Sequence, residues 1–302
     1  MLVRHLTYFV ALAEERHFAR AAGRCNVTQP TLSAAVRKLE DDLQVTLVIR
    51  AHIFVGLTPE GEKLLAWGRQ ILADYDSLKT DLTGSNGGVT GALRLGVIPA
   101  AMPIVATLTA EFLKANPAAT VDIRSLTSRS IAQGLDSFEL DGGITYLDNE
   151  PIAHVRSIPL YHERYTLIVP DGHALCELKS VSWKTAAGQR LCLLSQDMQN
   201  RRIIDRIAAS VGAPIHPSVV ANSFLAVLSH LRAGGWASIV PDSFLQLVGS
   251  QERLHALSIV EPEHSEILGL VVSDRHPQSP MAFALLTAAA YLDIAREMGP
   301  TS

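Results

Sequence analysis

The fold is decided by a stretch near the N-terminus, residues 17–43, which reads HFARAAGRCNVTQPTLSAAVRKLEDDL. Its first part predicts a short helix over residues 18–24, followed by a turn. Thr28 predicts the start of a second helix, because its hydroxyl can accept a hydrogen bond from a free backbone N–H, and Pro30 suits the first turn. The stretch therefore predicts two short helices joined by a tight turn.

The second helix of this stretch has an apolar and a polar face. The apolar stripe consists of Leu32, Val36, Leu39 and Leu43. The other faces carry Gln29, Thr31, Ser33 and Arg37. Side chains of these kinds can meet base edges or phosphates in a DNA groove, and the ring of Pro30 can touch a thymine methyl group. We expect Thr28 to act chiefly as the helix cap, next to the base-reading residues.

Two short strands are expected to follow, over residues 45–49 and 53–57. They would form a wing around Arg50, Ala51 and His52. Arg50 at its tip could lie against a phosphate or in a minor groove, and we count His52 with it as a candidate DNA contact. Residues 1–58 are therefore interpreted as a winged helix-turn-helix domain.

A long helix is predicted from residue 59 to about residue 82, and a hinge follows it up to residue 90. Apolar or small residues recur along it at the spacing of a heptad seam: Leu64, Gly68, Ile71, Tyr75, Leu78 and Leu82. A lone helix cannot bury such a stripe against itself. The stripe must pack either on an identical helix, which would make the protein a dimer, or on its own domain.

Strand-like and helical segments alternate from residue 91 to residue 302, which predicts α/β lobes with parallel strands joined by crossover helices. The expected strands are 93–98, 121–126, 142–146, 165–169, 191–195, 219–221 and 267–272. The expected helices are 104–114, 131–138, 201–211, 224–232 and 281–297. We expect lobe I to comprise about 91–161 and 266–302, lobe II about 162–265, and a cleft to lie between them.

Composition limits the class of protein. The net charge of −4, with 19% charged and 48% hydrophobic residues, is that of a globular protein without bulk positive charge. Neither a signal peptide nor a long apolar run is evident, so we expect a soluble, cytoplasmic protein. We expect no metal site and no cofactor. Cys25, Cys176 and Cys192 are interpreted as reduced thiols, with a redox switch between the last two as the lesser alternative.

Several motifs in fixed order resemble the LysR-type transcriptional regulators. They are LTYFVALAEE (residues 6–15), HFARAA (17–22), TQPTLS (28–33), RKLE (37–40) and LTPEG (57–61), with weaker similarity at VPDGH (169–173) and AGGW (233–236). The resemblance implies a winged helix-turn-helix, a dimerising linker helix, and a two-lobed effector domain similar to periplasmic binding proteins. It further implies a homotetramer that binds an operator, contacts RNA polymerase and responds to a small molecule.

The reading helix departs from that family at Ala34, where members often carry Arg or Gln. Residues 1–60 hold seven basic residues (Arg4, Arg16, Arg20, Arg24, Arg37, Lys38, Arg50) and six acidic ones (Glu14, Glu15, Glu40, Asp41, Asp42, Glu60). The domain is barely cationic. We therefore expect modest affinity for DNA in general and a dependence on several domains binding together.

The effector is expected where strands end and helices begin, between the two lobes. The first candidate is the loop after the first strand, Pro99, Ala100, Ala101 and Met102. Polar partners would come from Thr127, Ser128, Ser195, Gln196 and Asn222. Backbone N–H groups at a helix start suit a small anion, which is our hypothesis for the ligand. Family members often carry Ser or Thr in the first loop, whereas this chain has Ala100 and Ala101, which offer no hydroxyl group to a ligand.

Two other classes of protein fit a two-lobed α/β fold. An enzyme would need a nucleophile elbow, a phosphate-binding loop or a dinucleotide-binding fingerprint, and the sequence contains none of these motifs. A solute-binding protein would fit the last two-thirds of the chain alone, but not the helix-turn-helix motifs. A DNA-binding regulator is therefore the favoured interpretation.

Overall fold

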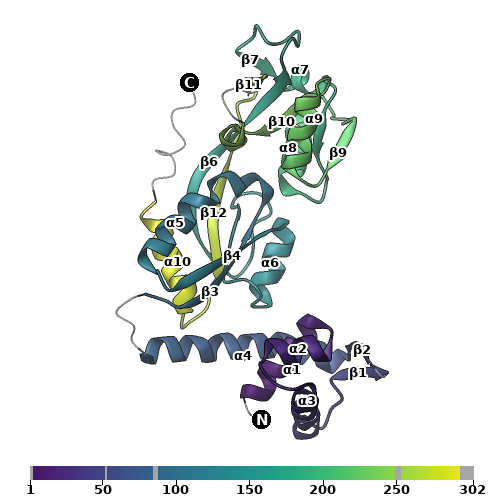
Figure 1. Ribbon diagram of the computed structural model, residues 1–302. Coiled ribbons are helices and arrows are strands. Elements are labelled where there is room, and N and C mark those ends of the chain that lie inside the picture. The colour runs from purple at the N-terminus through teal and green to yellow at the C-terminus, as the bar shows by residue number, and fades with distance from the viewer. Residues whose placement is uncertain (1–2, 52, 84–87, 249–252, 293–302) are drawn as a thin grey trace. The chain divides into compact units, whose positions relative to one another are not determined.

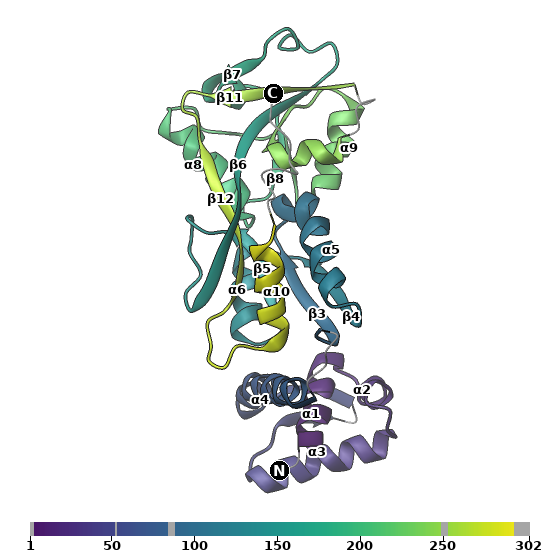
Figure 2. The same cartoon turned by 90° about the vertical axis from the view of Figure 1, so that its left-hand side faces the viewer.

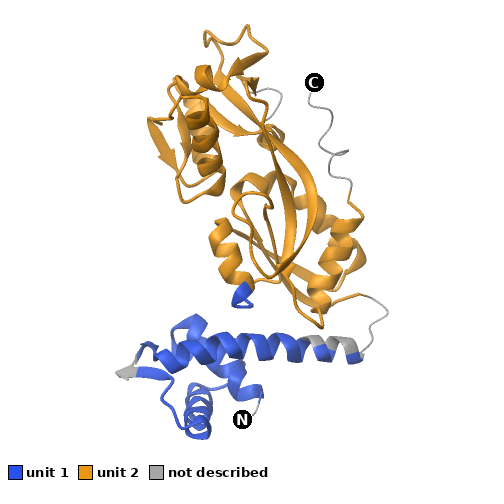
Figure 3. Cartoon of the chain, turned by 180° about the vertical axis from the view of Figure 1, so that it is seen from behind, with its two compact units in different colours: residues 1–86, 136–139 blue, residues 87–135, 140–302 orange. Residues whose placement is uncertain are grey.

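The computed structural model describes residues 3–51, 53–83, 88–248 and 253–292. The chain divides into two compact units (Figure 3): residues 1–86 with 136–139, and residues 87–135 with 140–302. The first unit is mainly helical and the second contains both helices and a large sheet. The predicted α/β class, with a helix-turn-helix at the N-terminus, is confirmed.

The first unit is built around three helices, as the apolar spacing predicts. In chain order its elements are α1 (Val3–Glu15), α2 (Phe18–Arg24), α3 (Gln29–Leu43), β1 (Val48–Ala51), β2 (Ile53–Leu57) and α4 (Pro59–Thr83) (Figure 1). Leu32, Val36 and Leu39 of α3 are fully buried. Leu43, predicted to continue their stripe, is 39% exposed. The helix ends there because Gln44 adopts a left-handed conformation.

The wing is shorter than the sequence predicts. Its first strand begins at Val48, so residues 45–47 of the expected strand form a connection instead. The carboxylate of Glu40 on α3 explains this, because its Oε1 accepts hydrogen bonds from the backbone N–H groups of Leu47 (2.9 Å) and Val48 (3.2 Å). The connection is thus tied to the end of α3, and antiparallel pairing starts only beyond it.

Helix α4 uses its apolar positions in two ways. Near its start Leu64 packs on the core of the first unit, and Gly68 lies against α1, where an added Cβ would come within 3.0 Å of the Leu6 side chain. Further along, the seam residues are exposed: Ile71, Tyr75, Leu78 and Leu82. The first half of the helix therefore packs on its own domain, whereas the second half leaves its stripe open.

The second unit begins with three strands separated by helices. Up to the long strand its elements are β3 (Gly91–Val97), η1 (Pro99–Ile104), α5 (Val105–Ala115), β4 (Ala119–Ser125), α6 (Ser128–Asp136), β5 (Gly142–Tyr146) and β6 (Val155–Pro170). Those that follow are β7 (Ser180–Ser182), α7 (Trp183–Ala187), β8 (Cys192–Leu194), α8 (Gln199–Ser210), β9 (Val219–Ala221), α9 (Phe224–Ala233), β10 (Ser238–Pro241), η2 (Asp242–Leu247), β11 (Leu254–Val260), β12 (Ser265–Ser273) and α10 (Pro280–Ala290).

The main sheet of this unit has the order β4-β3-β5-β12-β6-β11-β7, with β10 also paired to β6. Strand β3 is parallel to both β4 and β5, as expected. The expectation of parallel strands is wrong for β12, which is antiparallel to β5 and to β6. The chain leaves the first lobe along β6 and returns along β12, and these two passages run in opposite directions.

Strand β6 belongs to both lobes (Figure 2). Its first part, up to Arg164, pairs with β12, whereas its last part, from Tyr165 onward, pairs with β10 and β11. The predicted strand over residues 165–169 is therefore only the end of a 16-residue strand. A connection that is itself a strand of the sheet gives the lobes a continuous hydrogen-bonded hinge.

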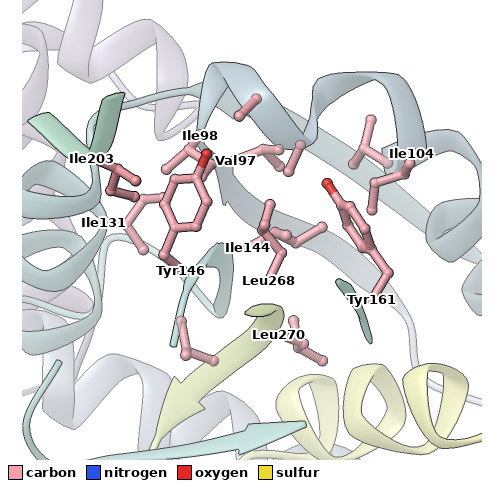
Figure 4. Packing of buried hydrophobic residues seen from close by; sticks show 14 of the residues in the cluster. Val97, Ile98, Ile104, Ile131, Ile144, Tyr146, Tyr161, Ile203, Leu268 and Leu270 are labelled. Atoms are coloured by element: carbon pink, nitrogen blue, oxygen red, sulfur yellow. The ribbon is translucent and has the colours of Figure 1, made fainter. Parts of the chain in front are cut away.

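The core of the first lobe is closely packed. Val97 of β3, Ile144 of β5 and Leu270 of β12 are fully buried (Figure 4). Helix α6 covers them through Ile131, which approaches the sheet where Gly143 has no side chain: a Cβ there would lie 2.3 Å from Ile131. This close contact fixes where α6 begins relative to the ends of the strands.

Candidate functional site

The start of α3 is stabilised by Thr28, as predicted. The Thr28 Oγ1 accepts a hydrogen bond from the N–H of Thr31 at 3.4 Å and lies 2.8 Å from the hydroxyl of Thr31. Pro30 occupies the first turn, where a missing N–H leaves no hydrogen bond unmade. Thr28, Gln29, Pro30 and Thr31 are all exposed, so the cap leaves this end of the helix accessible.

A stripe on α3 brings three of the predicted DNA contacts together. Gln29, Ser33 and Arg37 follow one another at intervals of four residues, which places them on the same side of the helix. Gln29 and Arg37 are exposed and Ser33 is half-buried. Ala34 is also exposed, so that a methyl group stands where a longer side chain would reach outward. The geometry supports a recognition surface centred on Gln29 and Arg37.

Most positive charge near α3 is already neutralised. Arg24 lies 2.6 Å from Glu14, and Arg20 lies 3.5 Å from Glu15. On α3 itself Lys38 pairs with Asp42 at 3.0 Å. Arg37, in contrast, makes no ion pair with any residue that the structure describes. It is therefore the cation of α3 most available to a phosphate.

The wing is anchored, but its predicted contacts cannot be placed. The hydroxyl of Thr58 donates to the carbonyl of Thr46 (2.6 Å) and accepts from the N–H of Gly61 (3.0 Å), which ties the start of α4 to the connection before β1. Arg50 lies in β1, but its side chain and the whole of His52 fall outside the described residues. Their role in DNA contact stays a prediction.

The second unit contains a cleft between its lobes, lined by Ile98, Pro99, Ala100, Thr127, Ser128, Leu194, Met198, Gln199 and Asn200. Its empty volume is about 220 Å³, including space that is open to solvent. Because this figure counts open solvent, the enclosed part of the cleft is smaller still. The starts of η1, α6 and α8 meet here.

Two buried polar atoms in the cleft lack a partner among the described residues. They are the hydroxyl oxygen of Ser128 and the Oε1 of Gln199, and the two residues are 5% and 3% exposed. Each stands at the first turn of a helix, α6 and α8, where backbone N–H groups have no acceptor within the helix. The N-cap of α8, Met198, provides no side-chain hydrogen bond either. The arrangement offers hydrogen bonds to a small polar ligand.

The structure places the predicted effector contacts unequally. Pro99, Ala100, Thr127 and Ser128 line the cleft, and Thr127 also caps α6 by accepting from the N–H of Ser130 at 3.1 Å. The other five predicted residues do not line the cleft. Ala101 is buried in the core, Met102 packs on that core, Ser195 is next to the end of β8, Gln196 accepts from Arg202 through its carbonyl, and Asn222 is exposed.

Sequence reasoning missed the part of the cleft that α8 supplies. Met198, Gln199 and Asn200 line it, but the helix was expected to start at Arg201. The signal that could have found them is the sequence Gln196-Asp197-Met198 after a buried strand, since a strand that ends at Leu194 must turn before the next helix. Ala100, from the first predicted loop, contributes a methyl group to the lining.

No cysteine takes part in the cleft lining. Cys192 is fully buried in β8, and burial raises the pKa of its thiol. Burial also raises the pKa of Cys25, against a smaller lowering by Arg24. These two thiols therefore lack the low pKa that a reactive cysteine needs. Cys176 is free as well, and its Sγ donates to the carbonyl of Pro170 at 3.5 Å.

Among the described residues, no group of three or more His, Cys, Asp or Glu side chains is placed to hold a metal ion. Within the same residues, no helix has the length and apolar character required to cross a membrane.

Comparisons with known proteins agree with this geometry. Residues 3–62 match the family "Bacterial regulatory helix-turn-helix protein, lysR family", and residues 86–292 match the "LysR substrate binding domain". The chain is 30% identical over 286 residues to the "Hydrogen peroxide-inducible genes activator" of Dickeya chrysanthemi, covering 93% of this chain and 91% of that protein. It is 29% identical over 282 residues to the "DNA-binding transcriptional dual regulator OxyR" of Escherichia coli K12, covering 93% and 91%.

A solved structure shows the same architecture over the full chain. A full-length OxyR variant from Pseudomonas aeruginosa superposes with a TM-score of 0.79 at 25% sequence identity. The match covers 98% of this chain and 97% of that one. Both units thus have counterparts in a single protein.

Proposed function

Because the chain belongs to the LysR family of DNA-binding transcription regulators, we propose that it reads its operator through α3 and is controlled by a small anion bound between the lobes of its second unit. The observation that carries the first part is the capped, exposed start of α3 with Gln29 and Arg37 on one stripe. Gln can bond adenine and Arg can bond guanine or phosphate. The alternatives of a solute-binding protein or an enzyme receive no support, since the relatives are regulators.

The unpartnered atoms in the cleft carry the second part. The hydroxyl of Ser128 and the amide of Gln199 stand at the N-termini of α6 and α8. Helix N-termini favour negative charge, because their free N–H groups and the helix dipole both stabilise an anion. An anion of a few heavy atoms would accept from the Ser128 hydroxyl and from the free N–H groups, and a protonated oxygen of such an anion would donate to the Oε1 of Gln199. We infer that Ser128 and Gln199 orient it.

Peroxide sensing, for which several relatives are named, is not what this cleft favours. A thiol that reacts with peroxide must be exposed and of low pKa. Cys192 is instead buried, and burial raises the pKa of its thiol. We therefore propose that the effector binds reversibly, without oxidising the protein. Replacing Cys192 by Ser should leave the response to the effector intact.

Assembly and location follow the family. Helix α4 exposes Tyr75, Leu78 and Leu82, and we propose that a second copy of α4 covers them in a homodimer. Pairs of dimers would form the homotetramer typical of the family, which would act on promoters in the cytoplasm together with RNA polymerase. Several DNA-binding domains bound at once would compensate for the small positive charge of each domain.

Binding to DNA at two salt concentrations is the direct test. The full-length protein is used to select duplexes from a random pool, and their affinity is measured by fluorescence anisotropy with and without a panel of small anions. The expected results are a steep loss of affinity at higher salt and a response to at least one anion. Ser128→Ala should bind the same duplex but lose the anion response. A response to hydrogen peroxide instead, abolished in Cys192→Ser, would overturn the anion proposal.

A further inference from the structure

Two buried carboxyl groups face each other at the hinge between the lobes. Glu163 of β6 and Glu266 of β12 are direct partners across the antiparallel pair, and they are 0% and 3% exposed. Directly opposed residues project their side chains from the same face of a sheet, and two like charges in this position repel. Strands β6 and β12 both connect the lobes, so this pair of buried acids lies at the hinge.

The two acids are supported differently. The Oε1 of Glu266 accepts a hydrogen bond from Asn149 Nδ2 at 2.6 Å and lies 2.7 Å from His264 Nε2. Glu163 bonds through Oε1 to the hydroxyl of Tyr146 at 2.5 Å, and its Oε2 has no hydrogen bond among the described residues. Nor does Glu163 form an ion pair with any Lys, Arg or His in that part of the chain. Glu163 is therefore the acid less able to remain ionised.

Acidic and phenolic groups surround Glu163 on every side. The groups around it are Tyr146 on β5, Tyr161 and Tyr165 on β6, Glu266 on β12, Asp242 on η2 and Asn200 on α8, with Arg164, Arg206 and His264 at the edge of this set. Figure 4 shows the hydroxyl groups of Tyr146 and Tyr161 directed to the same side of the buried cluster.

Burial dominates the electrostatics of this group. It is the main reason that the pKa of Glu163 is raised from 4.5 to about 8; the hydrogen bond from Tyr146 lowers this pKa, and the charges of Asp242 and Glu266 raise it. Burial likewise raises the pKa of Asp242. The geometry and the electrostatics both indicate a neutral carboxylic acid at the hinge near neutral pH.

The hinge acid is linked to the cleft through two hydrogen bonds. The hydroxyl of Tyr146 contacts Glu163 and also accepts a bond from Asn200 Nδ2 at 3.0 Å, and Asn200 lines the cleft. Neighbouring residues of α8 contact the same end of β5. Gln199 donates to the carbonyl of Asn149, and Arg202 holds Glu150 at 2.6 Å. These contacts hold the two lobes together across the cleft.

We propose that Glu163 binds a proton that stabilises the closed cleft, so that loss of this proton to solvent at mildly alkaline pH separates α8 from the end of β5. In the closed cleft the ionised carboxylate would face Glu266 and Asp242 without water, and opening admits water to solvate it. Proton release and lobe opening are then one coupled event. A role of this coupling in tuning the effector response rests on the proposed function. The protonation of Glu163 and its coupling to lobe opening do not.

The sign of the pH effect follows from the raised pKa. Between 4.5 and about 8 the folded protein binds this proton and the unfolded chain does not. Folding stability therefore falls as pH rises through this window, by up to about tenfold per pH unit in the unfolding constant. The loss is complete above the folded pKa and absent below the unfolded one.

Infrared spectroscopy of the full-length wild-type protein tests the proton directly. A protonated carboxylic acid has a C=O stretching band that an ionised carboxylate lacks. The band should be present near neutral pH, disappear with a midpoint of about 8, and be missing in Glu163→Gln. A midpoint below about pH 6, near the usual range of Glu, would overturn the proposal whether or not the variant folds.

Hydrogen–deuterium exchange tests the opening. After correction for the intrinsic exchange rate, the peptide containing residues 146–150 should exchange at least severalfold faster at about pH 9 than at about pH 6.5 in the wild type. In Glu163→Gln its protection should be the same at both pH values. Glu177→Gln, an exposed matched control, should behave as the wild type. Equal protection in the wild type at both pH values would refute the coupling, and neither readout depends on an effector or on DNA.

Discussion

The two candidate sites of this protein are built in contrasting ways. The DNA-reading surface lies within one turn-capped helix, where Gln29, Ser33 and Arg37 are exposed or half-buried and Arg37 forms no ion pair among the described residues. The effector cleft is assembled from distant segments, and Ser128 and Gln199 in it are almost fully buried. A local, exposed site can be altered without disturbing the fold. In an assembled, buried site, a substitution that removes packing or a hydrogen bond also affects the lobes that form it.

The largest effect on DNA binding is expected when the assembly that brings several DNA-reading surfaces together is disrupted. Leu78→Asp combined with Leu82→Asp places charges on the exposed stripe of α4, so the helix should no longer pair with a second copy. Affinity for the selected DNA should then fall by about 10² to 10⁴. Light scattering and anisotropy measure both quantities. Leu178→Asp, at another exposed leucine, should change neither; full-strength DNA binding by a monomeric double variant would refute the role of avidity.

A second substitution tests how closely α4 packs on the connection that precedes the wing. Gly61→Ala would place a Cβ 2.2 Å from the carbonyl oxygen of Leu47, a backbone atom that cannot move freely. We expect the first unit to lose about 1 to 3 kcal/mol in free energy of unfolding. Urea denaturation followed by circular dichroism measures it. Gly23→Ala, where no atom lies within 4 Å, is the matched control and should be neutral or slightly stabilising.

A third prediction concerns the exposed site itself. Arg37→Ala should reduce affinity for all DNA sequences by roughly tenfold and lower the salt dependence by about one ion, because it removes one phosphate contact. Its thermal unfolding should be unchanged, since the side chain is exposed. Arg124→Ala, which removes an exposed arginine paired with Asp122 in the second unit, should leave DNA affinity as it is. A loss confined to one base position would instead assign Arg37 to base reading.

The smallest change in stability is expected in the cleft. Ser128→Ala removes a buried hydroxyl that has no hydrogen-bond partner among the described residues, so the free energy of unfolding should change by no more than about 0.5 kcal/mol. The anion response should nevertheless be lost. If stability fell by several kcal/mol, the Ser128 hydroxyl would serve the fold and its assignment to ligand binding would be wrong.

The same contrast explains what could be predicted from the sequence. The cap at Thr28 and the buried stripe of α3 depend on neighbours within one helix, and both were predicted. Strands β7 and β10 were not, because strands of three and four residues are recognised only by their partners. Strand β11 was also missed, although Leu257 and Ile259 are buried on either side of the exposed Ser258. The α8 part of the cleft was missed because Gln199 reaches Asn149 only after both lobes have formed.

The pairing of two acids at the hinge was even harder to predict from the sequence. Glu163 and Glu266 are opposed only because β6 and β12 pair in one register, and a shift of one residue would turn one of them to the other face. Nothing in the local sequence of either strand indicates the other. Only the register of the two strands in the folded protein reveals that the two acids are opposed.

Strand β6 also limits how this protein can be engineered. Since its first part completes the sheet of one lobe and its last part that of the other, cutting the chain there would leave each lobe with an open sheet edge. Separately expressed lobes should aggregate, and chimaeras that exchange one lobe would need matched halves of both β6 and β12. The transferable module is the whole second unit, so a new effector specificity is better sought by redesigning the cleft than by grafting a lobe.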